Sequence, residues 1–219
     1  MTAFFVTGTD TGVGKTLVAC ALLHALARHH RRVVGMKPVA AGLVQTPSGW
    51  DSEDAMALRN ASTVAVPRDL DNPVHLPEAL SPHLAAGRAG MCIDIAHLVD
   101  CQRQLAQRAD AVVVEGAGGF LVPLSPGHTG GDLAQALGLP VVLVVGMRLG
   151  CLNHALLTAQ AIRACGLTLA GWVANRLDPG MAAPDENITY LRQQLNAPLL
   201  ADISHSAAPD FHRVAMQLP

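Results

Sequence analysis

Residues 3–17 read AFFVTGTDTGVGKTL, and this stretch decides the fold. The apolar run at residues 3–6 is typical of a buried strand, and the GKT at residues 14–16 opens a helix with apolar residues at helical spacing. A strand, a glycine-rich loop and a helix in this order are the context of a phosphate-binding loop. The unpaired N–H groups at the helix start carry partial positive charge and favour an anion. We therefore predict a nucleotide site at this loop.

The residues of the loop have separate expected roles. Gly12 and Gly14 let the backbone curl, Lys15 adds a positive charge, and the Thr16 hydroxyl is placed to ligate a magnesium ion. The general pattern G-x-x-x-x-G-K-[ST] places its first glycine where this chain has Thr9, and the glycine stands one place earlier. A glycine-rich turn that binds nothing is the alternative interpretation. The upstream strand and the intact GKT favour the nucleotide site.

Composition limits the other classes of function. The 219 residues suit one α/β domain with a sizeable core, and half of them are hydrophobic. No apolar run approaches the ~20 residues that span a membrane. The net charge of -2, without a basic stripe, indicates neither a nucleic-acid partner nor an anionic membrane. Since the first strand begins almost at once, we expect no signal peptide and a cytoplasmic protein. The five scattered cysteines are expected to be free thiols, and the ten histidines lack zinc-ligand spacing.

The rest of the chain alternates between strands and helices. Continuous β-branched runs at residues 111–114 and 141–145 are typical of strands buried on both faces of a parallel sheet. Further strands are expected at residues 32–36, near 74, 167–174 and 198–200. Helices are expected at residues 16–29, 51–60, 93–108, 132–137, 153–165 and 186–194, with a loop at 39–50 and a turn at 81–83. This alternation predicts a single domain over residues 1–219 with a P-loop NTPase-like three-layer α/β fold, a mostly parallel sheet flanked by helices.

Polar side chains follow several of the predicted strands. Ligands of such folds bind at the carboxyl ends of the strands, where Lys37, Glu115 and Asn175 stand. Glu115 suits a magnesium ion, with an ordinary loop acid as the alternative, and Asp54 is a second, weaker candidate. Lys37 can place a second positive charge on a transferring phosphoryl group, with a surface lysine as the alternative. These residues alone indicate an ATP-using enzyme or switch.

Several blocks of the sequence, taken together, resemble the dethiobiotin synthetase family. They are GTDTGVGKT at 8–16, KPV at 37–39 with Gly42, the acid Asp54, SPH at 81–83, VEGAGG at 114–119, LGCLNH at 149–154 and GWVAN at 171–175. The blocks keep the family's order and spacing to about residue 203, so the resemblance covers nearly the whole chain.

The resemblance implies an ATP-dependent ligase that makes dethiobiotin from 7,8-diaminononanoate, CO2 or bicarbonate, and ATP. One amine becomes a carbamate, a carbamate oxygen takes the γ-phosphoryl group, and the second amine attacks the mixed carbamic-phosphoric anhydride to close a ureido ring. By position, Thr16, Asp54 and Glu115 hold Mg²⁺, while Lys15 and Lys37 are the catalytic residues. The resemblance also implies a homodimer with active sites at the interface.

Further contacts carry over by position. The implied ATP-binding residues are Gly12, Val13, Gly14, Lys15, Thr16, Leu17, Asp54, Glu115, Gly116, Ala117, Gly118, Asn175, Arg176, Ser204, His205 and Ser206. The implied substrate-binding residues are Thr11, Lys37, Ala41, Ser81, Gly150, Cys151, Leu152 and Asn153. Ala41 stands where the family often has serine, and Ser204 follows the last strand where the family usually has proline. A tyrosine that some relatives place near the substrate carboxylate falls on Asn187, with Tyr190 one turn later.

Two related classes of P-loop protein are the alternatives. A partitioning-type ATPase switch carries a lysine five residues before the GKT lysine, and this chain has Asp10 there. A cobyrinate-amidating synthetase adds a glutaminase domain, for which we expect no room in 219 residues.

Overall fold

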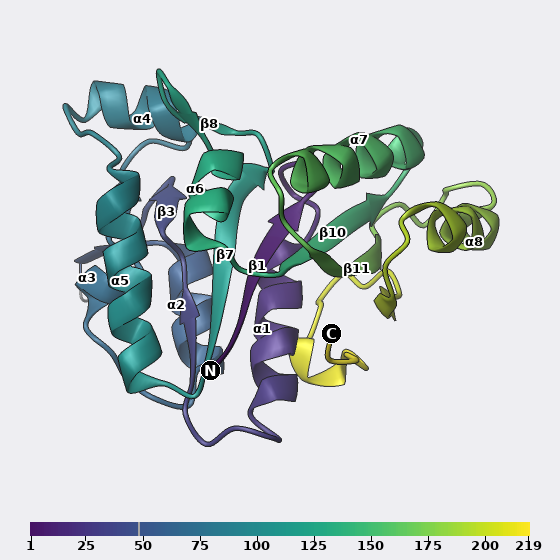
Figure 1. The fold of residues 1–219 in the computed structure, drawn as a ribbon, viewed down its shortest axis with the longest axis horizontal. Coiled ribbons are helices and arrows are strands. Elements are labelled where there is room, and N and C mark those ends of the chain that lie inside the picture. Colours follow the sequence, from purple (N-terminus) through teal and green to yellow (C-terminus); the bar gives the residue numbers. More distant parts are fainter. Residues whose placement is uncertain (48) are drawn as a thin grey trace.

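The computed structural model describes residues 1–47 and 49–219 and places one six-stranded sheet through the middle of the molecule (Figure 1). The strand order is β12-β11-β10-β1-β7-β2, and each neighbouring pair is parallel. These strands are β1 (Thr2–Gly8), β2 (Val33–Met36), β7 (Ala111–Gly119), β10 (Val141–Met147), β11 (Leu169–Arg176) and β12 (Leu199–Ile203). The predicted parallel sheet is confirmed.

Alternate side chains of each strand face opposite helical layers. In β1, Phe4 and Val6 pack with one set of helices, whereas Phe5 packs with the other. The first layer holds α1 (Lys15–Leu26), α2 (Glu53–Ala61) and a 3-10 turn (Phe211–Arg213). The second holds α3 (Arg68–Asp71), α5 (Ile95–Arg108), α6 (Gly130–Leu137), α7 (Cys151–Ala164) and α8 (Pro184–Gln194). Burial on both faces explains why the β-branched runs are continuous rather than alternating with polar residues.

A smaller apolar cluster extends the fold beyond the main sheet. It joins α4 (Pro82–Arg88) to the short strands β3 (Val39–Ala41), β6 (Val74–Leu76) and β8 (Pro123–Ser125). β3 pairs in parallel with β6, and β8 pairs antiparallel with β9 (His128–Thr129). Figure 1 shows α4 and β8 together at one end of the molecule. This cluster supplies a wall next to the carboxyl ends of the central strands.

Two local predictions are wrong. The predicted loop at residues 39–50 contains β3, β4 (Val44–Thr46) and β5 (Gly49–Asp51), while Ser48 lies outside the described residues. Strands of three residues are too short to carry a readable periodicity. The predicted turn at residues 81–83 is the start of α4, with Pro82 in the first turn, where its missing N–H leaves no helical bond unmade.

The remaining predicted elements are present with shifted ends. The helix predicted from residue 51 begins at Glu53, because Ser52 caps it by accepting a hydrogen bond from the Ala55 N–H at 3.4 Å. The helix predicted from residue 153 begins at Cys151, behind Gly150. All five cysteines are free thiols, as predicted.

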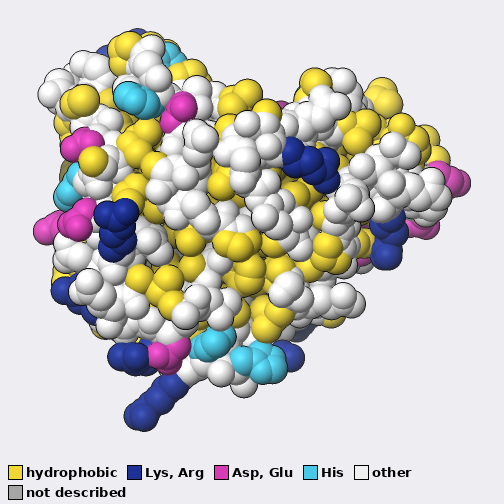
Figure 2. Space-filling view, in the orientation of Figure 1, with side chains coloured by type: hydrophobic (Ala, Val, Ile, Leu, Met, Phe, Trp, Pro, Cys, Tyr) yellow, Lys and Arg dark blue, Asp and Glu magenta, His cyan; other side chains and the backbone are white. Residues whose placement is uncertain are grey.

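The surface carries no concentration of one charge in the view shown. Figure 2 shows Lys and Arg side chains scattered over this face among hydrophobic and polar ones. Within the part of the chain that the structure describes, no helix combines the length and apolar character needed to cross a membrane.

Candidate active site at the carboxyl edge of the sheet

The loop between β1 and α1 curls as its glycines predict. Gly12 and Gly14 have left-handed backbones with φ of +73° and +90°, which a side chain would strain. At Gly14 a Cβ would also lie 2.3 Å from Asn175 Nδ2. At Gly8, the glycine that stands one place early, a Cβ would lie 2.5 Å from Val13 Cγ2. The loop is therefore tightly packed although its first glycine stands at position 8 instead of position 9.

Lys15 begins α1 and folds back over the loop. Its ammonium donates a hydrogen bond to the Asp10 carbonyl oxygen at 3.2 Å. Burial, reinforced by the nearby Lys37 ammonium, lowers the pKa of Lys15. The Asp10 carboxylate is paired with Arg148, which follows β10. A phosphate in this loop would meet the charge of Lys15 and the N–H groups of the helix start.

Three oxygen-bearing side chains from three elements meet beside the loop. Thr16 Oγ1 of α1 lies 2.8 Å from Asp54 Oδ1 of α2 and 2.9 Å from Glu115 Oε1 of β7. The hydroxyl has one proton and can donate it to only one carboxylate at a time. Glu115 Oε2 is buried and has no hydrogen-bond partner among the described residues. A buried carboxylate oxygen without a partner, next to a second carboxylate and a hydroxyl, fits a hard cation such as Mg²⁺.

The candidate metal site depends on more than protein carboxylates. Among residues 1–47 and 49–219, no group of three or more His, Cys, Asp and Glu side chains is placed to hold a metal ion. Two carboxylates and one hydroxyl leave coordination positions for water and phosphate oxygens, which is the usual arrangement for Mg²⁺ with a nucleotide.

Lys37, directly after β2, is buried between the same two carboxylates. Its Nζ lies 2.6 Å from Glu115 Oε1 and 2.7 Å from Asp54 Oδ2. Only 3% of Lys37 and 1% of Glu115 is exposed. Burial opposes charge on Lys37, but the two carboxylates together raise its pKa, so the ammonium stays protonated.

The two carboxylates differ in how burial and neighbours balance. Burial raises the pKa of Glu115, and the nearby charge of Asp54 adds to this, although Lys37 opposes both. For Asp54 burial is outweighed, because the charge and hydrogen bond of Lys37 and the hydrogen bond of Thr16 hold its pKa below the usual range. Asp54 is therefore the more firmly ionised of the two.

A cavity of about 800 Å³ opens at these groups, within the usual size range of small-ligand sites. It brings both lysines and both carboxylates together with three predicted substrate contacts, Thr11, Ala41 and Ser81. The lining residues are Thr11, Gly12, Gly14, Lys15, Thr16, Lys37, Val39, Ala41, Asp54, Ala79, Leu80, Ser81, Pro82, Glu115, Ala117, Gly118 and Val122.

Asn175 braces the phosphate loop from the end of β11. Its Nδ2 donates a hydrogen bond to the Val13 carbonyl oxygen at 2.9 Å, and the residue is buried. Ile203 of β12 pairs opposite Asn175, so residues 204–206 leave the sheet beside it and are exposed. An adenine contact from either segment stays a prediction.

Other predicted nucleotide contacts are less directly placed. The Arg176 guanidinium pairs with Asp202 at 2.7 Å and with Asp185 at 2.6 Å, and these hydrogen bonds raise its pKa. Leu17 lies half-buried in the first turn of α1. Gly116 lies within β7, and its carbonyl oxygen lies 3.4 Å from Lys37 Nζ.

The start of α7 lies apart from this cavity. Of the described residues that line the cavity, none belongs to the predicted substrate-binding segment 150–153. Gly150 caps the helix with a φ of +94°, Cys151 is buried, and Asn153 is exposed. Burial raises the pKa of the Cys151 thiol. A contact from Asn153 to a partner subunit's substrate stays a prediction.

The chain is similar to known proteins over nearly its whole length. The family model described as "AAA domain" matches residues 2–210. The chain is 52% identical over 216 residues to the ATP-dependent dethiobiotin synthetase BioD of Aromatoleum aromaticum, covering 99% of this chain and 96% of that protein. The chain belongs to the dethiobiotin synthetase family. The resemblance predicted from the sequence blocks is confirmed.

Solved structures of P-loop proteins share the fold with this dethiobiotin synthetase family member. The septum site-determining protein MinD of Pyrococcus horikoshii, complexed with Mg-ADP, is 19% identical, with a TM-score of 0.60 and coverage of 94% of this chain and 82% of that one. The signal recognition particle receptor FtsY of Elizabethkingia anophelis, in complex with GDP, is 14% identical, with a TM-score of 0.55. That match covers 99% of this chain and 60% of the FtsY chain. These likenesses confirm the fold class alone.

Sequence reasoning about this dethiobiotin synthetase family member missed two parts of the site. Leu80 and Val122 contribute apolar side chains to the cavity lining, but nothing in their spacing marks them. The ion pair between Asp10 and Arg148 also went unpredicted. Its only signal is that each residue follows a strand, β1 and β10, which are neighbours in the sheet.

Proposed function

We propose that this protein is an ATP-dependent dethiobiotin synthetase that closes the ureido ring from 7,8-diaminononanoate, CO2 or bicarbonate, and ATP. The observation that carries the proposal is the cluster of Lys15, Lys37, Asp54 and Glu115 around one cavity, in a chain 52% identical to a named dethiobiotin synthetase. Residues of the phosphate loop, Lys37, and the half-buried Ala41 and Ser81 all line this cavity, so nucleotide and diamine would meet there.

The proposed reaction has three bond-forming steps. One amine of the diamine adds to CO2 and loses a proton, which gives a carbamate. A carbamate oxygen attacks the γ-phosphorus of ATP, the bond to the β-phosphate oxygen breaks, and ADP leaves. The second amine attacks the carbonyl carbon of the carbamic-phosphoric anhydride, loses a proton, and expels phosphate as the ring closes.

The charges of the site suit these steps. A carbamate oxygen is already negative, so its attack needs no general base, and none of the lining residues is a histidine. Bringing carbamate and triphosphate together concentrates negative charge, which Lys15 and Lys37 would stabilise most as the new bond forms. In the proposed reactive state Lys37 exchanges part of its contact with the carboxylates for these anions.

Thr16, Asp54 and Glu115 would hold Mg²⁺, because their oxygens match the preference of a hard cation. When bound, the ion neutralises phosphate charge. Lys37 keeps the two carboxylates from repelling each other when the cation is absent.

The wider context of the enzyme is also a proposal. We infer a cytoplasmic homodimer in which Gly150, Cys151, Leu152 and Asn153 of one subunit meet the substrate carboxylate of the other. The partial positive charge at the N-terminus of α7, where Gly150 and Asn153 are exposed, suits a carboxylate there. Nucleic acid and membrane are not among the proposed partners.

One assay separates this proposal from its rivals. Phosphate release from Mg-ATP should require both 7,8-diaminononanoate and bicarbonate, and should drop to background when either is omitted. A partitioning-type switch would hydrolyse ATP without the diamine, and an amidating synthetase would require a glutamine-derived amine. The position of a partitioning lysine is held here by Asp10, whose carboxylate already pairs with Arg148 of the same chain.

A further inference from the structure

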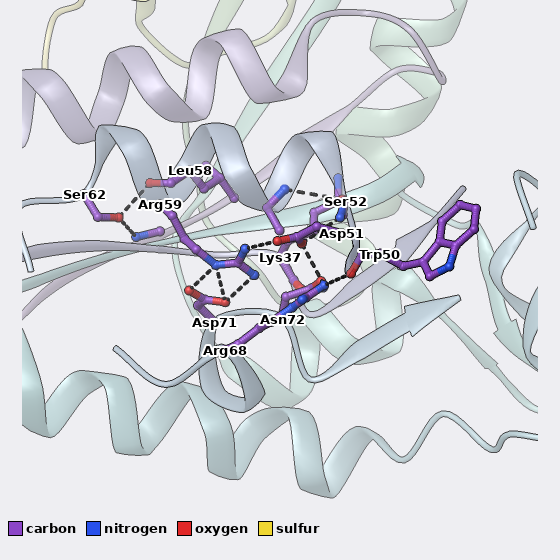
Figure 3. A network of polar contacts seen from close by, with 12 residues as sticks. Lys37, Trp50, Asp51, Ser52, Leu58, Arg59, Ser62, Arg68, Asp71 and Asn72 are labelled. Carbon is purple, nitrogen blue, oxygen red and sulfur yellow. Dashed lines mark hydrogen bonds and ion pairs between the residues drawn. The ribbon is translucent and has the colours of Figure 1, made fainter. Parts of the chain in front are cut away.

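A network of charged residues from α2, α3 and β5 lies near Lys37 (Figure 3). At its centre is Arg59 of α2. Arg59 Nε lies 2.8 Å from Asp71 Oδ2, Nη2 lies 3.0 Å from Asp71 Oδ1, and Nη1 lies 2.7 Å from Asp51 Oδ2. The guanidinium therefore holds one carboxylate with two nitrogens and a second carboxylate with the third. Arg68 also pairs with Asp51, at 2.9 Å, so two cations balance two anions.

The Asp71 arm of this network holds the backbone of Lys37. The Lys37 N–H donates a hydrogen bond to the Asp71 carbonyl oxygen at 2.7 Å. The next residue, Asn72, is fully buried and donates from Nδ2 to the Lys37 carbonyl oxygen at 2.7 Å. The backbone N–H and carbonyl groups of Lys37 are thus both hydrogen-bonded to residues 71–72, and Arg59 pairs with the carboxylate of Asp71.

The Asp51 arm holds the start of α2. Asp51 Oδ1 accepts a hydrogen bond from the Ser52 N–H at 2.7 Å, and Ser52 caps the helix. Asp54 stands in the first turn of that helix. The Arg59 guanidinium consequently links the segment that positions Lys37 to the helix end that positions Asp54.

The other end of α2 is attached to β2 independently of Arg59. At Gly35 a Cβ would lie only 2.8 Å from Leu58 Cβ, so helix and strand are in close contact there. Ser62 Oγ also accepts a hydrogen bond from the Gly35 N–H at 3.0 Å. Loss of the Arg59 bridge should therefore leave α2 in place while freeing its first turn.

We propose that Arg59 is a positioning residue that holds Asp54 of α2 against Lys37, although it touches neither side chain. The effect on catalysis rests on the proposed function, but the effect on geometry does not. A lysine could keep the charge, but it lacks the planar fork that reaches both carboxylates, so Arg59→Lys should break the bridge.

The test uses three variants and a matched control. Arg59→Lys keeps a cation beside buried Asp71, and the double variant Arg59→Gln with Asp71→Asn removes the charged pair together, so neither leaves a lone buried charge. Single Arg59→Gln is the severe variant. Arg32→Gln is the control, because Arg32 also grips one carboxylate, that of Asp110, with two nitrogens (3.2 and 2.7 Å), at the other end of β2.

The first readout is hydrogen exchange, which needs no turnover. In the Arg59 variants the Ala55 and Met56 amides, bound to Ser52 at the start of α2, should exchange at least about tenfold faster. Amides beyond Leu58, and all amides of α2 in Arg32→Gln, should change by less than about twofold. Unchanged exchange at the helix start, or equal acceleration along all of α2, would overturn the positioning role.

The second readout is a split between kinetic constants. Below the unfolding temperature, kcat of Arg59→Lys should fall about tenfold, since small misplacements of catalytic groups are costly, while KM for the diamine changes less than about twofold. Arg32→Gln should keep kcat within about twofold. If the Arg59 variants lose thermal stability but keep kcat, Arg59 is merely structural and the proposal fails. If wild-type protein shows no diamine-dependent turnover, the proposed function fails, and the exchange experiment still decides the role of Arg59.

Discussion

Lys37→Gln is the substitution that probes the chemistry most sharply. It removes the ammonium that lies 2.6 Å from Glu115 and 2.7 Å from Asp54, with little change in volume. At an effective dielectric constant of about 20, two unit charges 4 Å apart interact by about 4 kcal/mol. One lost stabiliser of a developing charge costs about 3 kcal/mol in measured cases. We therefore expect kcat to fall at least about a hundredfold.

The assay must separate this loss from a loss of ATP binding. ATP affinity measured by calorimetry should change by less than about threefold in Lys37→Gln, which is under 1 kcal/mol. Lys15→Gln should damage both affinity and kcat, because Lys15 belongs to the phosphate loop itself. Circular dichroism should confirm that each variant is folded, since two carboxylates lose their partner. If Lys37→Gln weakens ATP binding by a hundredfold or more but the single-turnover rate at saturating ATP is near that of wild type, Lys37 is a ground-state ligand and the reasoning is refuted.

Three further predictions follow from the same site. Glu115→Gln should leave the fold intact but lower magnesium-dependent turnover at least about tenfold; near-normal activity at saturating magnesium would shift the metal role to Asp54. Ala41→Ser should tighten binding of the diamine by about the free energy of one hydrogen bond, ~1 kcal/mol, and so lower its apparent dissociation constant. If a diamine titration shows no change, a water molecule or another side chain already makes that hydrogen bond. Lys15 and Lys37 are the chain's two lysines. The pKa of Lys15 is lowered and that of Lys37 is raised, so Lys15 is the more easily deprotonated amine. An amine-acetylating reagent near pH 8 should therefore modify Lys15 first, and bound ATP should protect it. Equal modification of both, read by peptide mass spectrometry, would contradict these pKa directions.

The parts of the fold that could be predicted are those with local signals. The runs at residues 111–114 and 141–145 are long enough to show burial on both faces, and both are central strands. The loop ahead of Lys15 is recognisable because its glycines are required by the backbone. Lys37 was found because it directly follows β2, and Glu115 because it directly follows the apolar run at residues 111–114, although β7 continues to Gly119.

The parts that could not be predicted depend on partners distant in sequence. β3 has three residues and is stabilised by its pairing with β6, which no local sequence pattern indicates. Proline is compatible both with a β-turn and with the first turn of a helix. At Pro82 the helix is favoured because Ala85 and Ala86 of α4 pack in the apolar cluster with β3, β6 and β8. Arg59 resembles any exposed helical arginine until Asp71 and Asp51 are brought to it by the fold.

The origin of the oxygen in the released phosphate tests the central claim most directly. Turnover of Mg-ATP and 7,8-diaminononanoate with ¹⁸O-bicarbonate, sampled before the label exchanges with water, should give phosphate that carries bicarbonate oxygen. This result is predicted because the carbamate oxygen that takes the γ-phosphoryl group leaves with it when the ring closes. Phosphate that instead carries oxygen from the water would mean direct hydrolysis of ATP and would contradict the carbamic-phosphoric anhydride.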